Sequence, residues 1–482
     1  MGQCRSTIRG RGQTMPSIHF YDAVAFGKHP AEGQLLRYDF ARYSEGAHEA
    51  ATYSIRLRDD VFVDPATAEK DDIALQDFDH GLTELAWARI AHQQFTAPDT
   101  LHVAYGATGR LEQFIRFGMY RNLLPFPSVG IPGWLHYLDL ETLTLAVRLL
   151  RPEEFPWQEL KSVRYQALHH SLTWDCRLQE QNRAFRAREI LGDLYRAAPR
   201  IVEHSIRMSS MRELKASLGL EDGEVSDMAT VRPNVIFHPS IAGANKVLLA
   251  LPVAVDVTYP DMLFVADLQA DLSDLCDPAN KQLKSLVRTH PNDASKPLVR
   301  VSLSRLPFCA PLNTIRKPDA ARLGIDMSHV QGNIARLRQS GFLPNRIKDA
   351  SLLELPGQPF DVYHRMWAGD FPPEDQERMR KLHASPPNDW LQILAGAMDG
   401  RFVELGERLV GREYPELLSE PQRAAWTSHV QSRVGGDFKT TDWLATMRKR
   451  AEDSAMTFPA AVGLVKLNER LARIFGGSAG GM

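Results

Sequence analysis

The chain has 482 residues, of which 44% are hydrophobic and 24% are charged, and its formal net charge is −2. This composition is typical of soluble globular proteins, and the length predicts two or three domains. The near-neutral charge gives no support for nucleic-acid binding, and no apolar run approaches the roughly 20 residues of a membrane helix.

The first fourteen residues, MGQCRSTIRGRGQT, carry three arginines but no apolar core. A secretory signal needs such a core, so we expect a disordered extension at 1–14, with Met15 as an alternative start. The cysteines lack the CxxC spacing of a zinc site and the pairing of a disulfide framework, which predicts a reducing, cytoplasmic setting. They stand at positions 4, 176, 276 and 309.

Residues 15–198 alternate short apolar runs with amphipathic segments. Residues 17–24 and 100–107 have the pattern of strands followed by turn residues. The segments GLTELAWARIAHQQF and LETLTLAVRLL space Leu, Ala and Ile as helices do. Strands that alternate with helices predict an α/β domain.

Residues 199–352 have a different pattern. DMLFVADL and PLVRVSLSRL are predicted strands, and the second alternates Val299 and Val301 with Arg300 and Ser302. This period of two predicts a half-buried antiparallel sheet in a β-rich domain.

The rest of the chain follows the linker LLELPGQPFD and is predicted to be helical. In GDFPPEDQERMRKLH, acidic residues follow Pro-Pro and basic residues come later, as the helix dipole favours. We expect a helical domain at 353–475 and a flexible tail at 476–482. Trp367, just before this helix, is predicted to anchor the core rather than to stack on bases.

Several blocks of the chain, in the same order, resemble bacterial exonuclease I, a family of ribonuclease H-like enzymes that degrade single-stranded DNA from its 3′ end. They are FYDAVAFGKHPA, YRNLLPFP, LDLETLTLAVRLLRPEEFPW, APRIVEHSIRMSSMRELKASL, LNTIRKPDAARLGID and VYHRMWAGDFPPEDQERM. The resemblance implies a ribonuclease H-like α/β domain, an SH3-like β-rich domain and an all-α C-terminal domain around single-stranded DNA. This order agrees with the three regions predicted above.

The family's chemistry uses two Mg²⁺ ions, which need converging carboxylates, and a His that takes a proton from water. Its first motif has an Asp and a Glu two residues apart, on one face of a strand. This chain has Asp22 and Val24 at these positions. An isopropyl group cannot ligate a metal, so we interpret Asp22 as a remnant of the site.

The second and third motifs also lack the required groups. Matching the YRN that follows places Leu111 at the carboxylate position of the second motif, with Glu112 beside it. Counting back from APRIVEH places Leu178 and Arg183 at the His and Asp of the third motif. A guanidinium would repel both metal ions, although it could hold a phosphate.

Three interpretations of the function follow. HHSLTWD offers His170 and Asp175 at the spacing of the third motif, so an active Mg²⁺-dependent site could combine them with Asp22 and Glu112. Our leading interpretation is a catalytically inactive relative that needs no cofactor. It would bind single-stranded DNA or a partner within a repair, mobile-element or anti-phage complex. A third hypothesis is a protein-interaction module that does not bind DNA.

The resemblance also implies binding residues outside the catalytic motifs. Arg151 and Arg164 match basic positions that would contact DNA phosphates or a partner. Arg316 and Arg338 match a basic pocket for the acidic, Phe-ended tail of single-strand-binding protein, whose terminal carboxylate suits a guanidinium. The alternative role for Arg316 is to stabilise the local fold.

Overall fold

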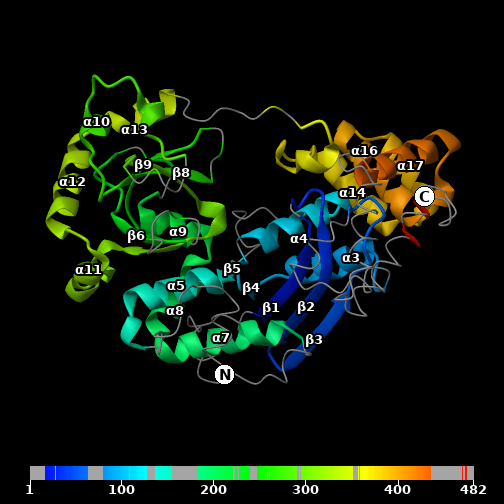
Figure 1. The fold of residues 1–482 in the computed structure, drawn as a ribbon, viewed down its shortest axis with the longest axis horizontal. Helices are drawn as coiled ribbons and strands as arrows, with labels where there is room; N and C mark the ends of the chain where they lie inside the picture. Colours follow the sequence, from blue (N-terminus) through cyan, green and yellow to red (C-terminus); the bar gives the residue numbers. More distant parts are fainter. Residues whose placement is uncertain are drawn as a thin grey trace, which may run out of the picture.

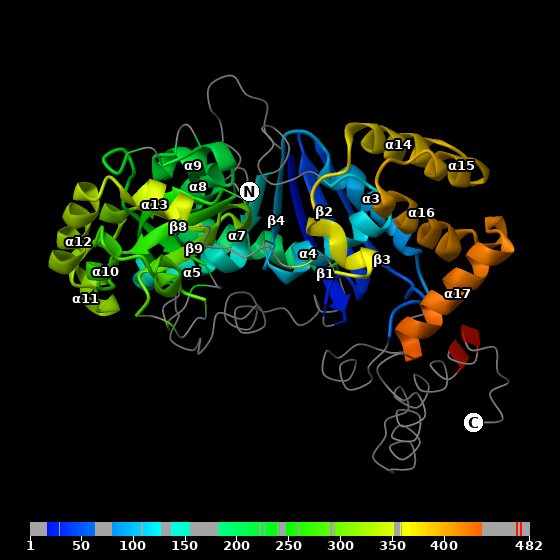
Figure 2. The same cartoon turned by 90° about the horizontal axis from the view of Figure 1, so that it is seen from above.

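Three regions follow one another along the chain in the computed structural model: an α/β region, a β-rich region and a helical region (Figure 1). The α/β region lies between the other two in both views (Figures 1 and 2). The structure describes residues 17–27, 29–62, 80–107, 109–126, 136–154, 182–220, 223–225, 227–238, 241, 247–257, 259, 261–289, 293, 295–350, 357, 359–435, 469–470 and 473–474. The predicted extension and tail lie outside these ranges. The predicted fold class is confirmed.

None of the helices in the described ranges combines the length and the apolar character that crossing a bilayer would require.

The α/β region is built on a five-stranded mixed sheet in the order β3-β2-β1-β4-β5. Strands β1, β4 and β5 run parallel, and β2 and β3 are antiparallel to their neighbours. The strands are β1 Ser17–Phe26, β2 Gln34–Ser44, β3 Ala47–Ser54, β4 Thr100–Ala104 and β5 His136–Asp139. The helices are α3 Glu84–Phe95, α4 Arg110–Arg121, α5 Leu140–Leu150, α7 Ala184–Ala197, α8 Pro199–Met208 and α9 Met211–Leu218. Because β1, β4 and β5 are parallel, their carboxyl ends meet at one edge of the sheet.

Alternating side chains on β1 face two different layers. His19 and Tyr21 pack against the ring of Phe95 in α3, with ring centroids 5.1 Å apart in each pair. His19 also contacts His102 on β4, with the two Nδ1 atoms 2.9 Å apart, and burial lowers the pKa of both rings. Since neighbouring strand residues point to opposite faces, Asp22 faces the other layer, which α7 covers.

The β-rich region contains a second sheet, entirely antiparallel, in the order β10-β6-β7-β8-β9. Its strands are β6 Asn234–Phe237, β7 Val247–Val255, β8 Met262–Asp267, β9 Leu298–Ser302 and β10 Phe308–Pro311. The helices α10 Ser273–Cys276, α11 Lys317–Leu323, α12 Met327–Gln339 and α13 Leu343–Asp349 belong to the same region. On β9, Arg300 is exposed and Val301 is buried, as the sequence pattern predicts.

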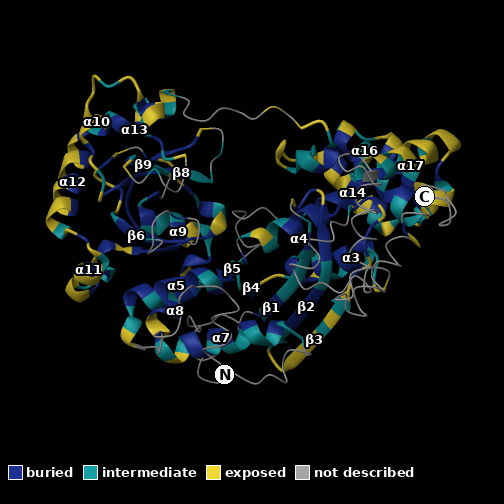
Figure 3. Ribbon diagram, in the orientation of Figure 1, coloured by how far each residue is buried: buried dark blue, intermediate teal, exposed yellow. Residues whose placement is uncertain are grey.

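The helical region consists of η8 Val362–Trp367, α14 Pro373–Ala384, α15 Trp390–Ala395, α16 Gly400–Glu413 and α17 Glu420–Gly435. Helix α14 begins with Pro373, has Glu374 and Asp375 in its first turn and ends with basic residues. This confirms the helix start predicted after Pro-Pro. Burial is concentrated on the inner faces of these helices, while α14 and α17 expose much of their outer surface (Figure 3).

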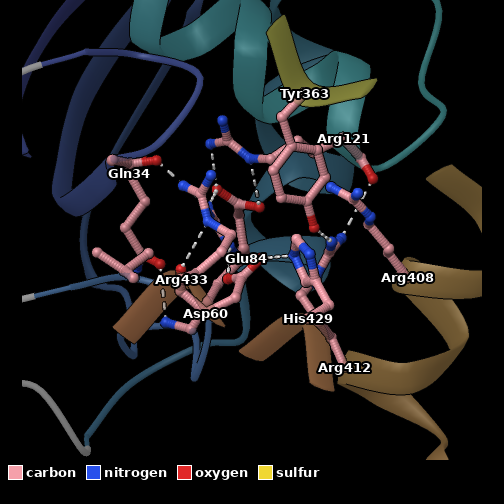
Figure 4. Close-up of polar contacts among 12 residues, drawn as sticks. Gln34, Asp60, Glu84, Arg121, Tyr363, Arg408, Arg412, His429 and Arg433 are labelled. Atoms are coloured by element: carbon pink, nitrogen blue, oxygen red, sulfur yellow. Dashed lines mark hydrogen bonds and ion pairs between the residues drawn. The ribbon is translucent and has the colours of Figure 1, made fainter. Parts of the chain in front are cut away.

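A buried ionic cluster joins the α/β region to the helical region (Figure 4). We call it the Glu84 cluster. Glu84 Oε1 accepts hydrogen bonds from Arg58 Nη1 and Arg121 Nη2, each at 2.7 Å, and Asp60 Oδ1 accepts from Arg58 Nε at 2.8 Å. Burial alone would raise the pKa of Glu84, but the positive charges of Arg121 and Arg58 outweigh it and lower the pKa to about 2.

Tyr363 of η8 stands at the centre of the same cluster (Figure 4). The guanidinium of Arg408 lies 4.6 Å from the centroid of its ring, and that of Arg433 lies 5.7 Å away. Arg412 Nη1 donates to the Tyr363 hydroxyl at 2.9 Å. Cations over an aromatic face are attracted by its quadrupole. The guanidiniums of Arg58 and Arg121, which belong to the α/β region, each lie 5.8 Å from the same ring centroid, so buried charge links the two regions.

Candidate functional site

The candidate site begins with two carboxylates on neighbouring strands. Asp22 on β1 is directly opposite Asp39 on β2 in the antiparallel register. Side chains of such a pair lie on the same face, with Cβ atoms roughly 5 Å apart. Burial raises the pKa of Asp22 to about 6, and the charge of Asp39 adds to this rise. A hydrogen bond from the Ala23 amide to Asp22 Oδ1, at 2.8 Å, opposes it.

Asp39 was not predicted from the sequence. It is completely buried, and so are its neighbours Tyr38 and Phe40, because both faces of β2 are covered here. Asp39 Oδ2 accepts hydrogen bonds from Arg37 Nε at 3.0 Å and from the Arg183 amide at 3.1 Å. The register between β1 and β2 brings Asp39 to Asp22.

Arg183 precedes α7 at its N-cap. The adjacent Asn182 fixes this helix start, since its Nδ2 donates to the carbonyls of Phe40 at 2.8 Å and Ala51 at 2.7 Å. The charge of Arg183 lowers the pKa of Asp22, and that of Arg186 one turn later has a smaller effect of the same sign. The Nε atoms of both arginines are buried and have no acceptor among the described atoms. The helix thus presents two cations to Asp22.

The other positions of the first two motifs add no ligand beside Asp22. Val24 lies on the same strand face as Asp22, opposite Arg37 on β2. Leu111 packs against the core. Glu112, in the first turn of α4, forms an ion pair with Arg116. Its charge acts on Tyr21, which is on the face of β1 opposite to Asp22.

Several predicted residues cannot be placed in this site. Arg164, His170, Asp175 and Leu178 lie outside the described residues. The rearranged site built from Asp22, Glu112, His170 and Asp175 stays a prediction.

The described residues do not fit a pair of magnesium ions. No group of three or more His, Cys, Asp or Glu side chains within them is arranged to hold a metal. Asp22 and Asp39 share their surroundings with Arg37, Arg183 and Arg186, so the guanidiniums outnumber the carboxylates. Mg²⁺ requires several oxygen ligands and is repelled by nearby cations. What this arrangement can do is hold an anion.

Arg316 and Arg151 lie where α5 meets the β-rich region. Arg316 Nε donates to Asp319 Oδ2 at 2.8 Å, its Nη1 donates to Glu153 Oε1 at 2.7 Å, and its Nη2 donates to the Leu150 carbonyl at 3.0 Å. Arg151 Nη1 lies 3.9 Å from Asp319 Oδ2. A guanidinium at a helix C-terminus satisfies its free carbonyls and complements its dipole. These contacts favour the local structural role of Arg316.

Arg338 differs from Arg316. It is exposed on α12 and has no hydrogen bond or ion pair with any described residue.

The prediction that Trp367 anchors the core is wrong. Its side chain is 63% exposed, and Phe360 nearby is 97% exposed. Tyr363, four residues before Trp367, is fully buried and takes the core position of this turn. Exposed aromatic rings can stack on bases.

Comparison with known proteins agrees with this fold over most of the chain. The family model described as Exonuclease I SH3-like domain matches residues 233–350, and the one described as Exonuclease I C-terminal domain matches residues 360–462. Exodeoxyribonuclease I of Escherichia coli K12 is 24% identical over 446 residues, which cover 87% of this chain and 90% of the relative.

Solved structures share the arrangement. Escherichia coli exonuclease I in complex with a dA16 oligonucleotide has a TM-score of 0.82 at 21% identity, covering 96% of this chain and 100% of that one. A structure of SSB/Exonuclease I in complex with the inhibitor CFAM has a TM-score of 0.80 at 21% identity, with the same coverage. At this level of identity, the structural likeness establishes the fold.

Proposed function

Because the chain belongs to the exonuclease I family, we propose that it binds single-stranded DNA without cleaving it. The observation that carries this proposal is the position of Arg183 beside Asp22. Where the family's chemistry needs a third-motif carboxylate and two dications, this chain supplies a guanidinium. One such group can neutralise Asp22 and still offer donors to a phosphate.

The absence of catalysis follows from the charge balance of the site. Cleavage of a phosphodiester requires many kcal/mol of transition-state stabilisation, most of which the metal ions supply in two-metal enzymes. Asp22 and Asp39 are matched by Arg37, Arg183 and Arg186, and Val24 offers no oxygen. These residues favour binding a phosphate anion over binding two cations. We propose no cofactor.

Surfaces outside this site support the binding role. A single-strand binder without sequence preference combines cations that follow the backbone with aromatic rings that stack on bases. Trp367 and Phe360 supply exposed rings. Arg338 is free for the acidic tail of a single-strand-binding protein, so a role as one subunit of a DNA-processing complex in the cytoplasm is consistent with the same surfaces.

The proposal is tested with a 5′-labelled single-stranded oligonucleotide, incubated with the protein and Mg²⁺ or Mn²⁺. We expect a shifted band in a native gel and no shortened product in a denaturing gel. Shortening that depends on the metal and disappears in Asp22→Ala would contradict the proposal and support the rearranged site. Neither shift nor shortening would support a protein-interaction module instead.

A further inference from the structure

Strand β3 forms an open edge of the α/β sheet (Figures 1 and 3). It pairs only with β2, and its residues are exposed except Ala51 and Tyr53, which are half-buried. The strand at the opposite edge, β5, is short and mostly buried. β3 is therefore the edge of this sheet at which another strand could be added.

The contacts of β3 show which of its backbone groups face outward. Ala51 is directly opposite Phe40 on β2, and Asn182 Nδ2 donates to both of their carbonyls. One amide group reaches both oxygens only when they point into the space between the two strands, as in a hydrogen-bonded pair. The odd-numbered residues of β3 therefore bond to β2, and the even-numbered residues direct their N–H and C=O groups away from it.

The outward groups differ along the strand. At one end, the Ser54 carbonyl accepts a hydrogen bond from the Leu82 amide at 2.9 Å, which closes this end of the edge. His48, Ala50 and Thr52 have no backbone hydrogen bond to another described segment. Their outward N–H and C=O groups are arranged symmetrically about Ala50.

β3 carries none of the devices that usually protect an edge strand. Its sequence, AHEAATYS, contains no Pro and no Lys, and its register with β2 has no bulge. Glu49 is its one carboxylate residue, and it is directly opposite Arg42 on β2. The strand is therefore not protected against pairing with a further strand.

We propose that β3 pairs with β3 of a second copy of this chain, antiparallel and about a two-fold axis at Ala50. In this register His48 is opposite Thr52 of the second copy, so all the outward groups of these residues form hydrogen bonds. Alanines meet at the centre, and Glu49 is opposite Ala51 and not a like charge. A second copy is favoured over an unrelated peptide, because the outward groups are symmetric about one residue, as a two-fold interface requires.

The pairing would join two five-stranded sheets into one continuous sheet. A two-fold axis perpendicular to the sheet keeps both copies of α7, and both Asp22 side chains, on the same face. The two β1 strands would lie five strand spacings apart, roughly 24 Å. A single strand edge is smaller than the roughly 1,200 Å² of a standard interface, so we expect a weak dimer, populated at concentrations on the order of tens of micromolar.

The first test is disulfide trapping in full-length variants that each carry one added cysteine. Residues of a hydrogen-bonded antiparallel pair have Cα atoms about 5.5 Å apart, a separation that a disulfide spans. Oxidised A50C should therefore form a cross-linked dimer on a non-reducing gel. H48C and T52C should each stay at the background level alone and should cross-link when mixed. The unmodified protein, with its four cysteines, gives the background.

Sedimentation velocity over a range of protein concentrations gives an independent measure. A50K places two like charges directly opposite each other, which should raise the dissociation constant of the dimer about fivefold. The control A47K adds the same charge at the end of the strand, opposite Tyr53 of the second copy, and should leave the dissociation constant unchanged. Both positions are exposed, so both variants should keep the melting temperature of the unmodified protein.

Three outcomes would overturn the proposed dimer. One is a monomer at every concentration with no cross-link in A50C; binding of DNA by that monomer would leave the proposed function intact. Another is a dimer that persists in A50K while A50C does not cross-link, which would place the interface elsewhere. The third is equal cross-linking by H48C alone and by A50C, which would exclude the register centred on Ala50.

Discussion

Two clusters of arginine and carboxylate in the α/β region shift the pKa of a buried carboxylate in opposite directions. In the Glu84 cluster, two arginines donate directly to Glu84 and its pKa falls to about 2. At the candidate site, Arg183 lies near Asp22, yet burial raises the pKa of Asp22 to about 6. The residue types are the same. The difference teaches that the balance between desolvation and the positive charge of nearby guanidiniums decides the direction in which the pKa of a buried carboxylate shifts.

The contrast also separates two roles. Glu84 joins α3 to Arg121 of α4, and the same cluster holds Tyr363 of the helical region, so it serves stability. Asp22 is kept in a site that disfavours its ionised form, and such groups are concentrated at functional sites. The predictions below test this separation.

The largest effect is expected for Glu84→Gln. This change leaves Arg58 and Arg121 buried without their common acceptor, which should lower the free energy of unfolding by about 3–5 kcal/mol, as for other broken buried pairs. Urea unfolding at pH 7 measures it. Glu377→Gln is the control, because its ion pair with Arg380 is 64–68% exposed and should change stability by less than about 0.5 kcal/mol. Equal unfolding midpoints for the two variants would contradict the structural role of Glu84.

Asp22→Asn should change the free energy of unfolding in the opposite direction. A carboxyl whose pKa rises from 3.8 to about 6 on folding contributes stability below pH 3.8 that is lost as the pH rises through 6. At pH 7 the amide should therefore raise the free energy of unfolding by about 3 kcal/mol, two pKa units at 1.36 kcal/mol each. Urea unfolding between pH 4 and pH 7 should give a gain that shrinks as the pH falls.

Asp39→Asn is the matched control for Asp22→Asn. Asp39 accepts hydrogen bonds from Arg37 and from the Arg183 amide, so weakening them should destabilise the protein by about 1–3 kcal/mol. A stability gain in Asp39→Asn, or a gain in Asp22→Asn that does not depend on pH, would contradict the assigned charge states.

The smallest effect is expected for Arg183→Gln. Loss of this cation should raise the pKa of Asp22 further, which a ¹³C NMR titration of the carboxyl would detect. It should also weaken binding of single-stranded DNA about tenfold, near 1.5 kcal/mol, the lower end for a charged hydrogen bond. Arg200→Gln, an exposed arginine on α8, should change neither quantity. Unaltered titration of Asp22 would disprove the assigned contact.

The succession of an α/β, a β-rich and a helical region follows from the sequence, because strand and helix periodicities are local properties. That Val24 shares a strand face with Asp22 is equally visible, since positions two apart on a strand share a face. The start of α14 could be predicted from Pro373 and the acids after it. For the candidate site, this local information ends with Asp22 and Val24.

Other features depend on contacts between residues far apart in the chain, so only the tertiary structure decided them. The β1–β2 register brings Asp39 to Asp22, and the docking of α7 places Arg183 beside them. The burial of Tyr363 leaves Trp367 exposed, although either aromatic suits a core position by sequence alone. The sequence by itself determined which chemical groups are present and which are missing. The packing of distant segments determined whether each group is paired, buried or free to bind, because pairing and burial depend on neighbours that no local pattern specifies.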